Sequence, residues 1–308
     1  MTVIVFGSAN VDLVMPVSAF PIPGETVLTP SYDAVPGGKG ANQALAAKRA
    51  GVPVNFVGAV GQDHFADCAL SLLREESVGL EATTVSDRPT GCAVVMVNTA
   101  GENSIVVASG ANLDVRAHQV SDALLQSNRV LVLQQEVSFE ENESLGCRAQ
   151  QAGLKVVLNL APAKRIPVGL LANTDFLIVN EVEAAFLAGS QPQVSMTELA
   201  EHLTDTYDCC TLITLGSAGC VVATGDERAF GIDAPELEVV DTTGAGDTFT
   251  GYFAALLAQE RLSLRQCVAG AIQGGFSCLY SDGGTVGNSL CGGCVADKAI
   301  KARYTSDL

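Results

Sequence analysis

The stretch VLVLQQEVSFEENESLGCRAQQAGLKVVL, residues 130–158, decides the fold class. Its two ends, Val130–Leu133 and Lys155–Leu158, are short, mostly apolar runs rich in Val and Leu, which is typical of buried strands. The segment between them suits a helix over residues 138–152, which Gly153 closes. A strand, a helix and a second strand in this order predict a unit of a parallel sheet.

The same alternation extends over most of the chain. Further strands are predicted at Val3–Phe6, Phe176–Val179 and Thr211–Leu215. Helices are predicted from Glu181 and over residues 195–207, 246–259 and 263–280, and a late antiparallel pair at Cys220–Ala223 and Arg228–Gly231. We therefore expect an α/β protein with a Rossmann-like, mostly parallel sheet and helices on both faces. In such sheets, ligands bind at the carboxyl ends of the strands.

Two other segments depart from this rhythm. Residues 92–98 and 104–108 are apolar runs rich in Val, and the turn-forming segment 99–103 joins them. Residues 26–35 also lack the strand–helix alternation. These segments predict a small antiparallel sheet that is inserted into the main fold.

Composition limits the classes of partner. The chain has 308 residues, of which 48% are hydrophobic, so it can bury a large core. Lys and Arg total 17 and Asp and Glu total 34, so the net charge is −17. A field of this sign repels nucleic acid and anionic membranes, and neither is an expected partner. It also repels nucleotides, so a nucleotide site must supply backbone N–H groups, a few cations and a metal ion.

The apolar runs and the N-terminus predict a cytoplasmic protein, and the cysteines form no complete metal site. No run approaches the roughly 20 apolar residues that span a bilayer, and Asp12 interrupts an N-terminal stretch that has no basic region. Ten cysteines are scattered along the chain. Cys291-Gly-Gly-Cys294 has the form of half a zinc site, but no second pair or nearby His completes it. We expect the cysteines to be small buried hydrophobic residues, with two free thiols in the tail.

Residues 241–251, DTTGAGDTFTG, are candidates for a phosphoryl-transfer site. Gly244, Ala245 and Gly246 let the backbone turn tightly and direct successive N–H groups at one point, at the start of an apolar helix. The positive end of that helix adds to an anion hole. Asp247 at its mouth can accept a hydroxyl proton as attack proceeds. The alternative is that Asp247 is only the N-cap of the helix.

Polar residues near the N-terminus suit a polyol. In Gly37-Gly-Lys-Gly-Ala-Asn-Gln43, glycines open a helix over residues 44–50, and Lys39 and Asn42 can hold hydroxyl groups. The spacing is not that of a Walker A loop, and a tight turn with an exposed Lys is the alternative. Asn10 and Asp12 follow the first strand on one face and suit vicinal hydroxyls, unless they form a plain Asx turn.

Two further groups of residues suit a nucleotide. Asn180 and Glu183 share one face of a first helical turn and can order waters around Mg²⁺, although they also fit a capping box. Thr214 and Ser217 can donate hydroxyl contacts, and the glycines beside them permit close approach by phosphate, although a plain β-turn is the alternative. The residues of this predicted phosphate loop are Thr214, Gly216, Ser217 and Gly219. Glu136 also follows a strand and could contact sugar or metal, but no motif around it indicates a binding site.

Two of these motifs together resemble the ribokinase (PfkB) family of carbohydrate kinases. Residues 37–43 are similar to the family's N-terminal signature and residues 241–249 to its C-terminal signature, in the same order. The resemblance covers residues 7–287, nearly the whole chain. It implies a kinase body formed by residues 1–12, 36–89 and 109–308, and a β-sheet lid formed by residues 13–35 and 90–108. It also implies a homodimer joined through the lids.

The resemblance also implies the roles of individual residues. The pentose would bind to Asn10, Asp12, Gly38, Lys39, Gly40, Asn42, Glu136 and Asp247, with Asp247 as the general base for the 5-hydroxyl. The nucleotide and its Mg²⁺ would lie at Asn180, Thr214, Gly216, Ser217, Gly219, Gly244, Ala245 and Gly246, with Glu183 near the metal through water. A monovalent cation, expected to be K⁺, would bind at Asp241, Thr243, Cys278, Ser281, Gly283 and Gly287. Ser281 stands where the family often has Arg or Lys.

The implied activity is ATP-dependent phosphorylation of D-ribose at its 5-hydroxyl. Within the same family, the acceptor could instead be deoxyribose, fructose, a keto-deoxy sugar acid or a nucleoside. A non-catalytic sugar-binding protein is the alternative from another class, and the presence of Asp247 argues against it. A nicotinamide dehydrogenase is excluded, because residues 7–12 lack the Gly-x-Gly-x-x-Gly pattern after the first strand.

Overall fold

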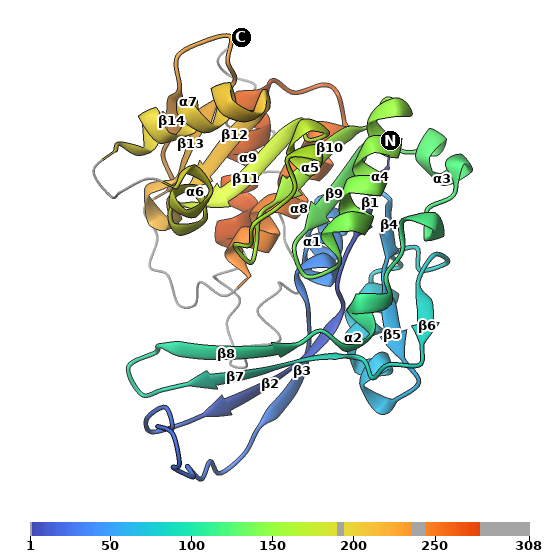
Figure 1. The fold of residues 1–308 in the computed structure, drawn as a ribbon, viewed down its shortest axis with the longest axis vertical. Coiled ribbons are helices and arrows are strands. Elements are labelled where there is room, and N and C mark those ends of the chain that lie inside the picture. Colours follow the sequence, from blue (N-terminus) through green and yellow to red (C-terminus); the bar gives the residue numbers. More distant parts are fainter. Residues whose placement is uncertain (1, 190–193, 236–243, 278–308) are drawn as a thin grey trace.

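The computed structural model describes residues 2–189, 194–235 and 244–277 (Figure 1). Within these residues, the main sheet has eight strands in the order β14-β13-β12-β11-β10-β9-β1-β4. The six strands from β12 to β4 are parallel, and β13 and β14 continue the sheet in antiparallel fashion. The bounds are β1 Val3–Phe6, β4 Val54–Val57, β9 Val130–Gln134, β10 Lys155–Asn159, β11 Phe176–Asn180, β12 Cys210–Thr214, β13 Cys220–Ala223 and β14 Phe230–Ile232.

Helices cover both faces of this sheet. On one face lie α1 Lys39–Arg49, α2 His64–Glu75, α8 Ala245–Ala258 and α9 Leu264–Ser277. On the other lie α3 Asp122–Ser127, α4 Phe139–Gln151, α5 Val168–Ala172, α6 Glu181–Ala188 and α7 Met196–Tyr207. The prediction of an α/β fold with a mostly parallel sheet is confirmed.

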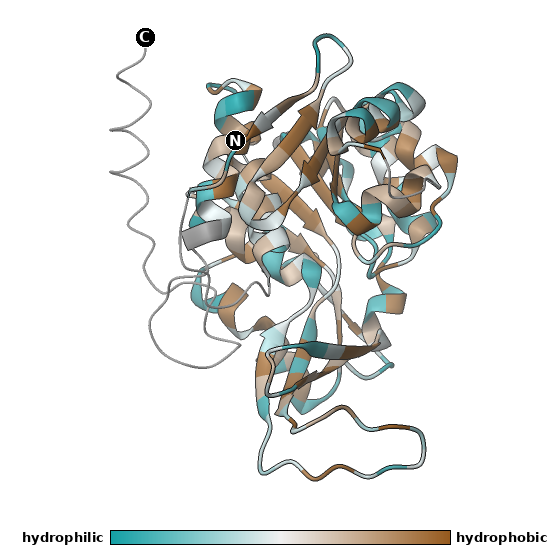
Figure 2. Ribbon diagram, turned by 90° about the vertical axis from the view of Figure 1, so that its left-hand side faces the viewer, coloured by the Kyte–Doolittle hydropathy of each residue, from teal (hydrophilic) through white to brown (hydrophobic). Residues whose placement is uncertain are grey.

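Strand β1 explains why the apolar runs are continuous. Its alternate residues Val3 and Val5 pack in the core beneath α1, α8 and α9, whereas Ile4 and Phe6 pack in the core beneath α4 and α7. All four side chains are fully buried, since a parallel strand that is covered on both faces has no side for water. Figure 2 shows the resulting apolar centre, with polar residues on the outer parts of the helices.

A separate sheet extends from the lower end of the body (Figures 1 and 2). Its order is β3-β2-β7-β8, with bounds β2 Asn10–Pro16, β3 Asp33–Gly37, β7 Gly91–Val97 and β8 Asn103–Ala108. Strands β2 and β7 are parallel, so the prediction of a purely antiparallel sheet is wrong for this pair. Both strands leave the body at the same place, Asn10 opposite Gly91, and therefore run in the same direction.

Smaller elements complete the connections. Strands β5 Ala59–Gly61 and β6 Thr84–Ser86 form a two-stranded sheet, and three 3-10 helices lie at η1 Gly110–Asp114, η2 Ala117–Gln119 and η3 Gly216–Ala218. Among the helices that the structure describes, none combines the length and the apolar character that crossing a bilayer requires. The described cysteines are all free thiols, three of them buried and four half-buried, and the tail pair Cys291 and Cys294 lies outside the described residues.

Candidate active site

The predicted site residues come together at the carboxyl edge of the parallel strands. Ser8 and Asn10 follow β1, Glu136 follows β9, and Asn180 and Thr214 are the last residues of β11 and β12. Because the chain passes from β1 to β4 on one side and later to β9 on the other, the edge between β1 and β9 is the topological switch point. Residues proposed for the sugar lie at this switch point, and those proposed for the nucleotide lie farther along the same edge.

Asp247 is not the N-cap of α8. Gly244 takes that position with a φ of 78°, and Asp247 is the third helical residue, with only 6% of its surface exposed. The alternative that Asp247 serves as an N-cap is therefore wrong. The first N–H groups of α8 have no acceptor within the helix, so this turn presents donors and positive potential beside the Asp247 carboxylate.

Three side chains of α1 surround the Asp247 carboxylate. Asn42 Nδ2 donates to Oδ2 at 3.3 Å, and Gln43 Nε2 donates to Oδ1 at 3.0 Å. The Lys39 ammonium lies 3.9 Å from Oδ1. The nearby Asp247 charge is the main cause that raises the pKa of Lys39 above its usual value. The base candidate is thus surrounded by donors from a single helix.

Close packing of α1 and α8 makes these contacts possible. A Cβ atom on Gly251, one turn after Asp247, would lie 2.4 Å from the Gln43 carbonyl oxygen and 2.6 Å from Ala46 Cβ. Only glycine lets the helix axes approach this closely. Gly251 therefore sets the distance across which Asn42 and Gln43 reach Asp247.

Glu136 fixes the start of α1. Its Oε2 accepts from Ser8 Oγ at 2.5 Å and from the Lys39 backbone N–H at 3.0 Å, and Gly40 N donates to Ser8 Oγ at 3.2 Å. The helix begins at Lys39, five residues before the predicted start at residue 44. The difference has a physical cause, because the carboxylate that satisfies the first N–H comes from a distant strand end.

Asn10 and Asp12 occupy one face of β2. The alternative, a plain Asx turn, does not form; both residues lie in a strand, and its period of two places the two side chains on one face, as predicted, toward the site. Asn112 Nδ2 donates to Asn10 Oδ1 at 2.7 Å, and the Ala9 N–H donates to Asn112 Oδ1 at 3.0 Å. Asn112, on η1, is a supporting residue that sequence reasoning missed, and no local motif marks it.

Asp12 is half-buried, and one of its carboxylate oxygens is a buried acceptor without a partner. Its Oδ1 has no hydrogen-bond partner, and a Cβ on Gly37 would lie 2.2 Å from its Oδ2, so glycine at position 37 makes room for the carboxylate. Burial, and then the charges of Glu136 and Asp247, raise the pKa of Asp12 to about 7. A carboxyl group in this state is suited to accept a hydrogen bond from a hydroxyl group.

Asn180 and Glu183 form the capping box of α6. Glu183 N donates to Asn180 Oδ1 at 2.8 Å, and Asn180 N donates to Glu183 Oε2 at 2.9 Å. The capping-box alternative is therefore correct as a description of the local structure. The cap uses only one oxygen of Glu183, and burial raises the pKa of this carboxyl above its usual value.

The loop between β12 and β13 is compact and exposed. Thr214 Oγ1 donates to the Val179 carbonyl oxygen at 3.3 Å, and Leu215 N donates to the Gly219 carbonyl oxygen at 2.8 Å. Gly216 and Gly219 have φ values of 54° and 97°, which side chains rarely tolerate. Gly216 and Ser217 are exposed on the same side as Asn180, which leaves them accessible to a ligand.

The expected monovalent-cation ligands cannot be placed. Asp241, Thr243, Cys278, Ser281, Gly283 and Gly287 all lie outside the described residues. Within residues 2–189, 194–235 and 244–277, no group of three or more His, Cys, Asp or Glu side chains is arranged to hold a metal ion.

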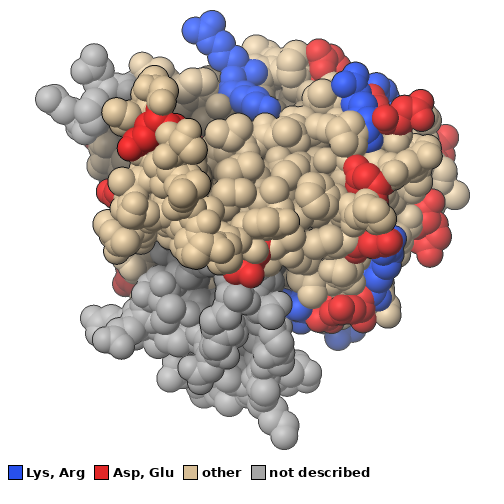
Figure 3. Space-filling view, turned by 90° about the horizontal axis from the view of Figure 1, so that it is seen from below, with Lys and Arg blue, Asp and Glu red and all other residues tan. Residues whose placement is uncertain are grey.

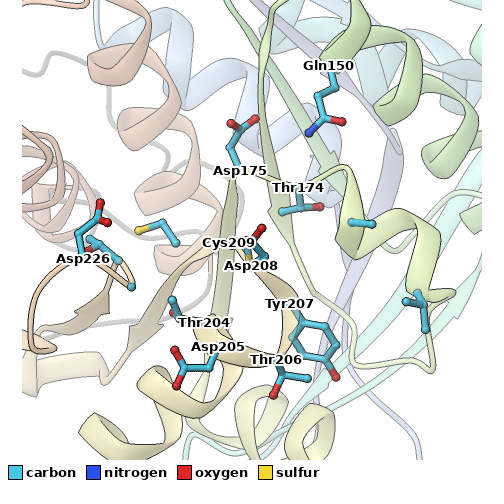
Figure 4. Close-up of a pocket in the computed structure, with 15 residues that line it drawn as sticks. Gln150, Thr174, Asp175, Thr204, Asp205, Thr206, Tyr207, Asp208, Cys209 and Asp226 are labelled. Carbon is cyan, nitrogen blue, oxygen red and sulfur yellow. The ribbon is translucent and has the colours of Figure 1, made fainter.

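A cavity of about 690 Å³ lies at the opposite edge of the sheet (Figure 4). Asp175 and Cys209, which immediately precede β11 and β12, are among its lining residues. Other lining side chains include Asp205, Asp208 and Asp226, so the cavity is acidic and suits neither a phosphate nor the chemistry at the carboxyl edge.

The fold and the site define a phosphotransferase-type α/β protein, with a group of polar and charged residues beside a helix N-terminus. Residues 2–279 match the profile of the pfkB family carbohydrate kinases, and this chain belongs to that family.

Individual relatives are similar over most of this chain. It is 37% identical to the ribokinase of Haemophilus influenzae, over 84% of this chain and 86% of that protein. It is 36% identical to the bifunctional ribokinase/ribose-5-phosphate isomerase A of Fructilactobacillus sanfranciscensis, over 86% of this chain, and spans half of that protein. The structure of Arabidopsis thaliana ribokinase complexed with ribose and ATP has a TM-score of 0.82 and 31% identity, and the match covers 92% of this chain and 93% of that one.

Proposed function

We propose that this chain catalyses the ATP-dependent phosphorylation of D-ribose at its 5-hydroxyl, with Asp247 as the general base. The observation that carries the proposal is the buried Asp247 carboxylate at the start of α8. Donors from α1 lie on one side of it, and the residues proposed for the nucleotide lie on the other. The named activities of the similar proteins support the choice of ribose and ATP.

The sugar binds at the switch point between β1 and β9. Asn10, Asp12 and Glu136 present acceptors, and Lys39 and Asn42 present donors, while Gly38 and Gly40 allow the backbone to approach. The unpartnered Asp12 oxygen would accept a sugar hydroxyl, which removes the cost of its burial. A neutral acceptor rich in hydroxyl groups fits this set better than a phosphorylated one.

The nucleotide lies along the ends of β11 and β12. Asn180, Thr214, Gly216, Ser217 and Gly219 line its path, and the N–H groups of the turn at Gly244, Ala245 and Gly246 receive the γ-phosphoryl group. Backbone donors suit this role because the protein carries a net charge of −17, which repels the nucleotide everywhere else.

Two metal ions complete the proposal. Mg²⁺ would accompany ATP and contact Glu183 through water, and it would offset charge on the phosphates. The buried Glu183 carboxyl with its raised pKa fits this place, since a nearby cation stabilises its ionised form. A monovalent cation, K⁺, would bind at the residues of the 241–243 and 278–287 segments named above.

In the reaction, the 5-hydroxyl oxygen attacks the γ-phosphorus, the bond to the β–γ bridging oxygen breaks, and ADP leaves. Asp247 accepts the hydroxyl proton, a contribution of about 10²–10⁴-fold. The first N–H groups of α8 and the Lys39 ammonium stabilise charge on the transferred group.

The four-stranded sheet serves as a lid and as the contact between two copies of this chain. By register, Ile105 and Val107 lie on the same face as Val95 and Ala93, and both are more than 40% exposed. Figure 3 views the molecule from below and shows a broad expanse with few charged side chains on that side. A second copy would cover Ile105, Val107 and the open edge of β8. Free thiols at all described cysteines support a cytoplasmic location.

A coupled assay of ADP release tests the function. We expect release from MgATP to depend on ribose and to exceed that with deoxyribose, fructose, a keto-deoxy sugar acid or a nucleoside. Replacement of K⁺ by Na⁺ in the same assay tests the cation. A higher kcat/KM for another sugar would assign that acceptor instead, and the absence of turnover with every acceptor would support a non-catalytic sugar-binding protein.

A further inference from the structure

We infer that Gln43 and Asn159 are positioning residues that hold Oδ1 of Asp247 and leave Oδ2 as the oxygen that takes the sugar proton. The inference rests on the proposed role of Asp247 as the base. Neither residue belongs to the sugar or nucleotide groups described above. Gln43 lies on α1, and Asn159 is the last residue of β10, between the sugar and nucleotide parts of the edge.

A directed series of hydrogen bonds connects the main sheet to the carboxylate. Asn159 Nδ2 donates to the Ile178 carbonyl oxygen at 3.3 Å, which directs Asn159 Oδ1 toward Gln43. Gln43 Nε2 donates to Asn159 Oδ1 at 3.1 Å and to Asp247 Oδ1 at 3.0 Å. Since a backbone carbonyl can only accept, its position fixes the orientation of both amides.

The reverse orientation of Gln43 is excluded by its neighbours. A flipped amide would place Gln43 Oε1 against the Asn159 oxygen and the Asp247 carboxylate, so three acceptors would meet without a proton. In the observed orientation, Gln43 Oε1 is buried without a partner. The fold keeps this unsatisfied acceptor, and both N–H groups of the amide serve Asn159 and Asp247.

Burial distinguishes this pair from the other contacts of Asp247. Gln43 is fully buried and Asn159 is 6% exposed, so water cannot replace their hydrogen bonds. The Lys39 side chain is 31% exposed and lies on the sugar side, and Asn42 contacts the other oxygen at the longer distance of 3.3 Å. Oδ1 therefore has a buried donor in Gln43 as well as Lys39 at 3.9 Å, whereas Oδ2 has only the longer contact from Asn42.

Paired substitutions separate a positioning role from a structural one. Gln43→Met leaves both Asn159 Oδ1 and Asp247 Oδ1 without this donor, and Asn159→Leu leaves one N–H of Gln43 without its acceptor. In the double variant only Asp247 Oδ1 loses a donor, and Ile178 O keeps its bond from Leu160 N. We expect the single variants to lose thermal stability and the double variant to regain part of it. The kcat of the double variant should remain at least about tenfold below that of the wild type, with the KM for ribose within about threefold.

Gln134→Met is the matched control. Gln134 is also fully buried, and it donates to the Phe6 carbonyl oxygen rather than to Asp247. We expect this variant to lose stability and to keep kcat within about threefold of the wild type. A double variant of Gln43 and Asn159 that regains kcat together with stability would overturn the inference.

Gln43→Glu tests the positioning role of Gln43 with a side chain of nearly the same shape. It places a carboxylate beside Asp247 Oδ1, and we expect kcat to fall at least about tenfold while the KM for MgATP stays within about threefold. An unchanged kcat, or failure of all these variants to fold, would show that the pair acts only in core stability. If the wild-type chain releases no ADP with any sugar, the proposed function is wrong, and the inference is wrong with it. If the wild type is active and the variants keep its kcat, the inference alone is wrong.

Discussion

At the scale of single residues, the Asp247 carboxylate carries the proposed chemistry, and its removal gives the sharpest test. Asp247→Asn keeps the shape and loses the proton acceptor. We expect kcat to fall at least about 100-fold, with the KM for ribose within about threefold. Steady-state ADP release checks this result, and a variant with nearly normal kcat would remove Asp247 from the role of base.

Asp12 gives a prediction about pH. Its pKa is about 7 in the folded protein, above the ordinary 3.8, so between these values the folded state binds more protons than the unfolded state. Stability from this group is therefore lost as the pH rises from about 4 to 7. We expect Asp12→Asn to raise the free energy of unfolding, by at most about 4 kcal/mol, and by more at pH 8 than at pH 5. Urea unfolding without sugar measures the difference, and an equal effect at both pH values would contradict it.

Candidate residues could be chosen from the sequence where the signal is local. Asp247, Asn10 and Glu136 became candidates because each lies beside a strand end or in a glycine-rich turn. The contact of Gln43 with Asp247 spans 204 positions of the chain and depends on how α1 meets α8, so no pattern within α1 reveals it. The support of Asn10 by Asn112 was hidden for the same reason.

At the scale of elements, the contact between α1 and α8 aligns the base with its donors. Gly251→Ala places a methyl group 2.4 Å from the Gln43 carbonyl oxygen, so the two helices must separate. We expect a loss of about 1–3 kcal/mol in the free energy of unfolding, together with a lower kcat. Denaturant unfolding and the ADP assay measure the two effects.

Gly146→Ala on α4 is the control for this helix contact. The nearest atom to its added Cβ would be 3.7 Å away, an ordinary contact. We expect this change to raise stability by about 0.5–1 kcal/mol, because alanine favours a helix interior more than glycine does. Equal effects of the two substitutions would show that helix propensity, and not helix spacing, decides the result at position 251.

Seven of the eight strands of the main sheet were predicted to within about two residues, because continuous apolar runs mark strands that are buried on both faces. The eighth, β4, was not predicted. Strand β2 was missed. Its first residues, Asn10 and Asp12, are poor strand formers and suggest a turn. Parallel pairing with β7, from a distant part of the sequence, overrides this local preference.

At the scale of the whole molecule, the lid surface predicts assembly. We expect Ile105→Glu combined with Val107→Glu to give monomers, because charges on this face of the sheet would be buried between two copies. The wild-type chain should sediment as a dimer. Val85→Glu is the control, since Val85 is 64% exposed on β6, outside this sheet. A wild-type monomer, or a dimer unaffected by the double substitution, would contradict lid-to-lid contact.

Strand β2 connects the proposed sugar site to the small sheet. It begins with Asn10 and Asp12, two of the residues proposed for the sugar, and continues into the small sheet, whereas the residues proposed for the nucleotide belong to the large sheet and α8. Inherited changes in the small sheet can therefore alter the choice of acceptor while the phosphate donor site stays intact. One ancestral body could thus give rise to kinases for different sugars by variation in a few short strands.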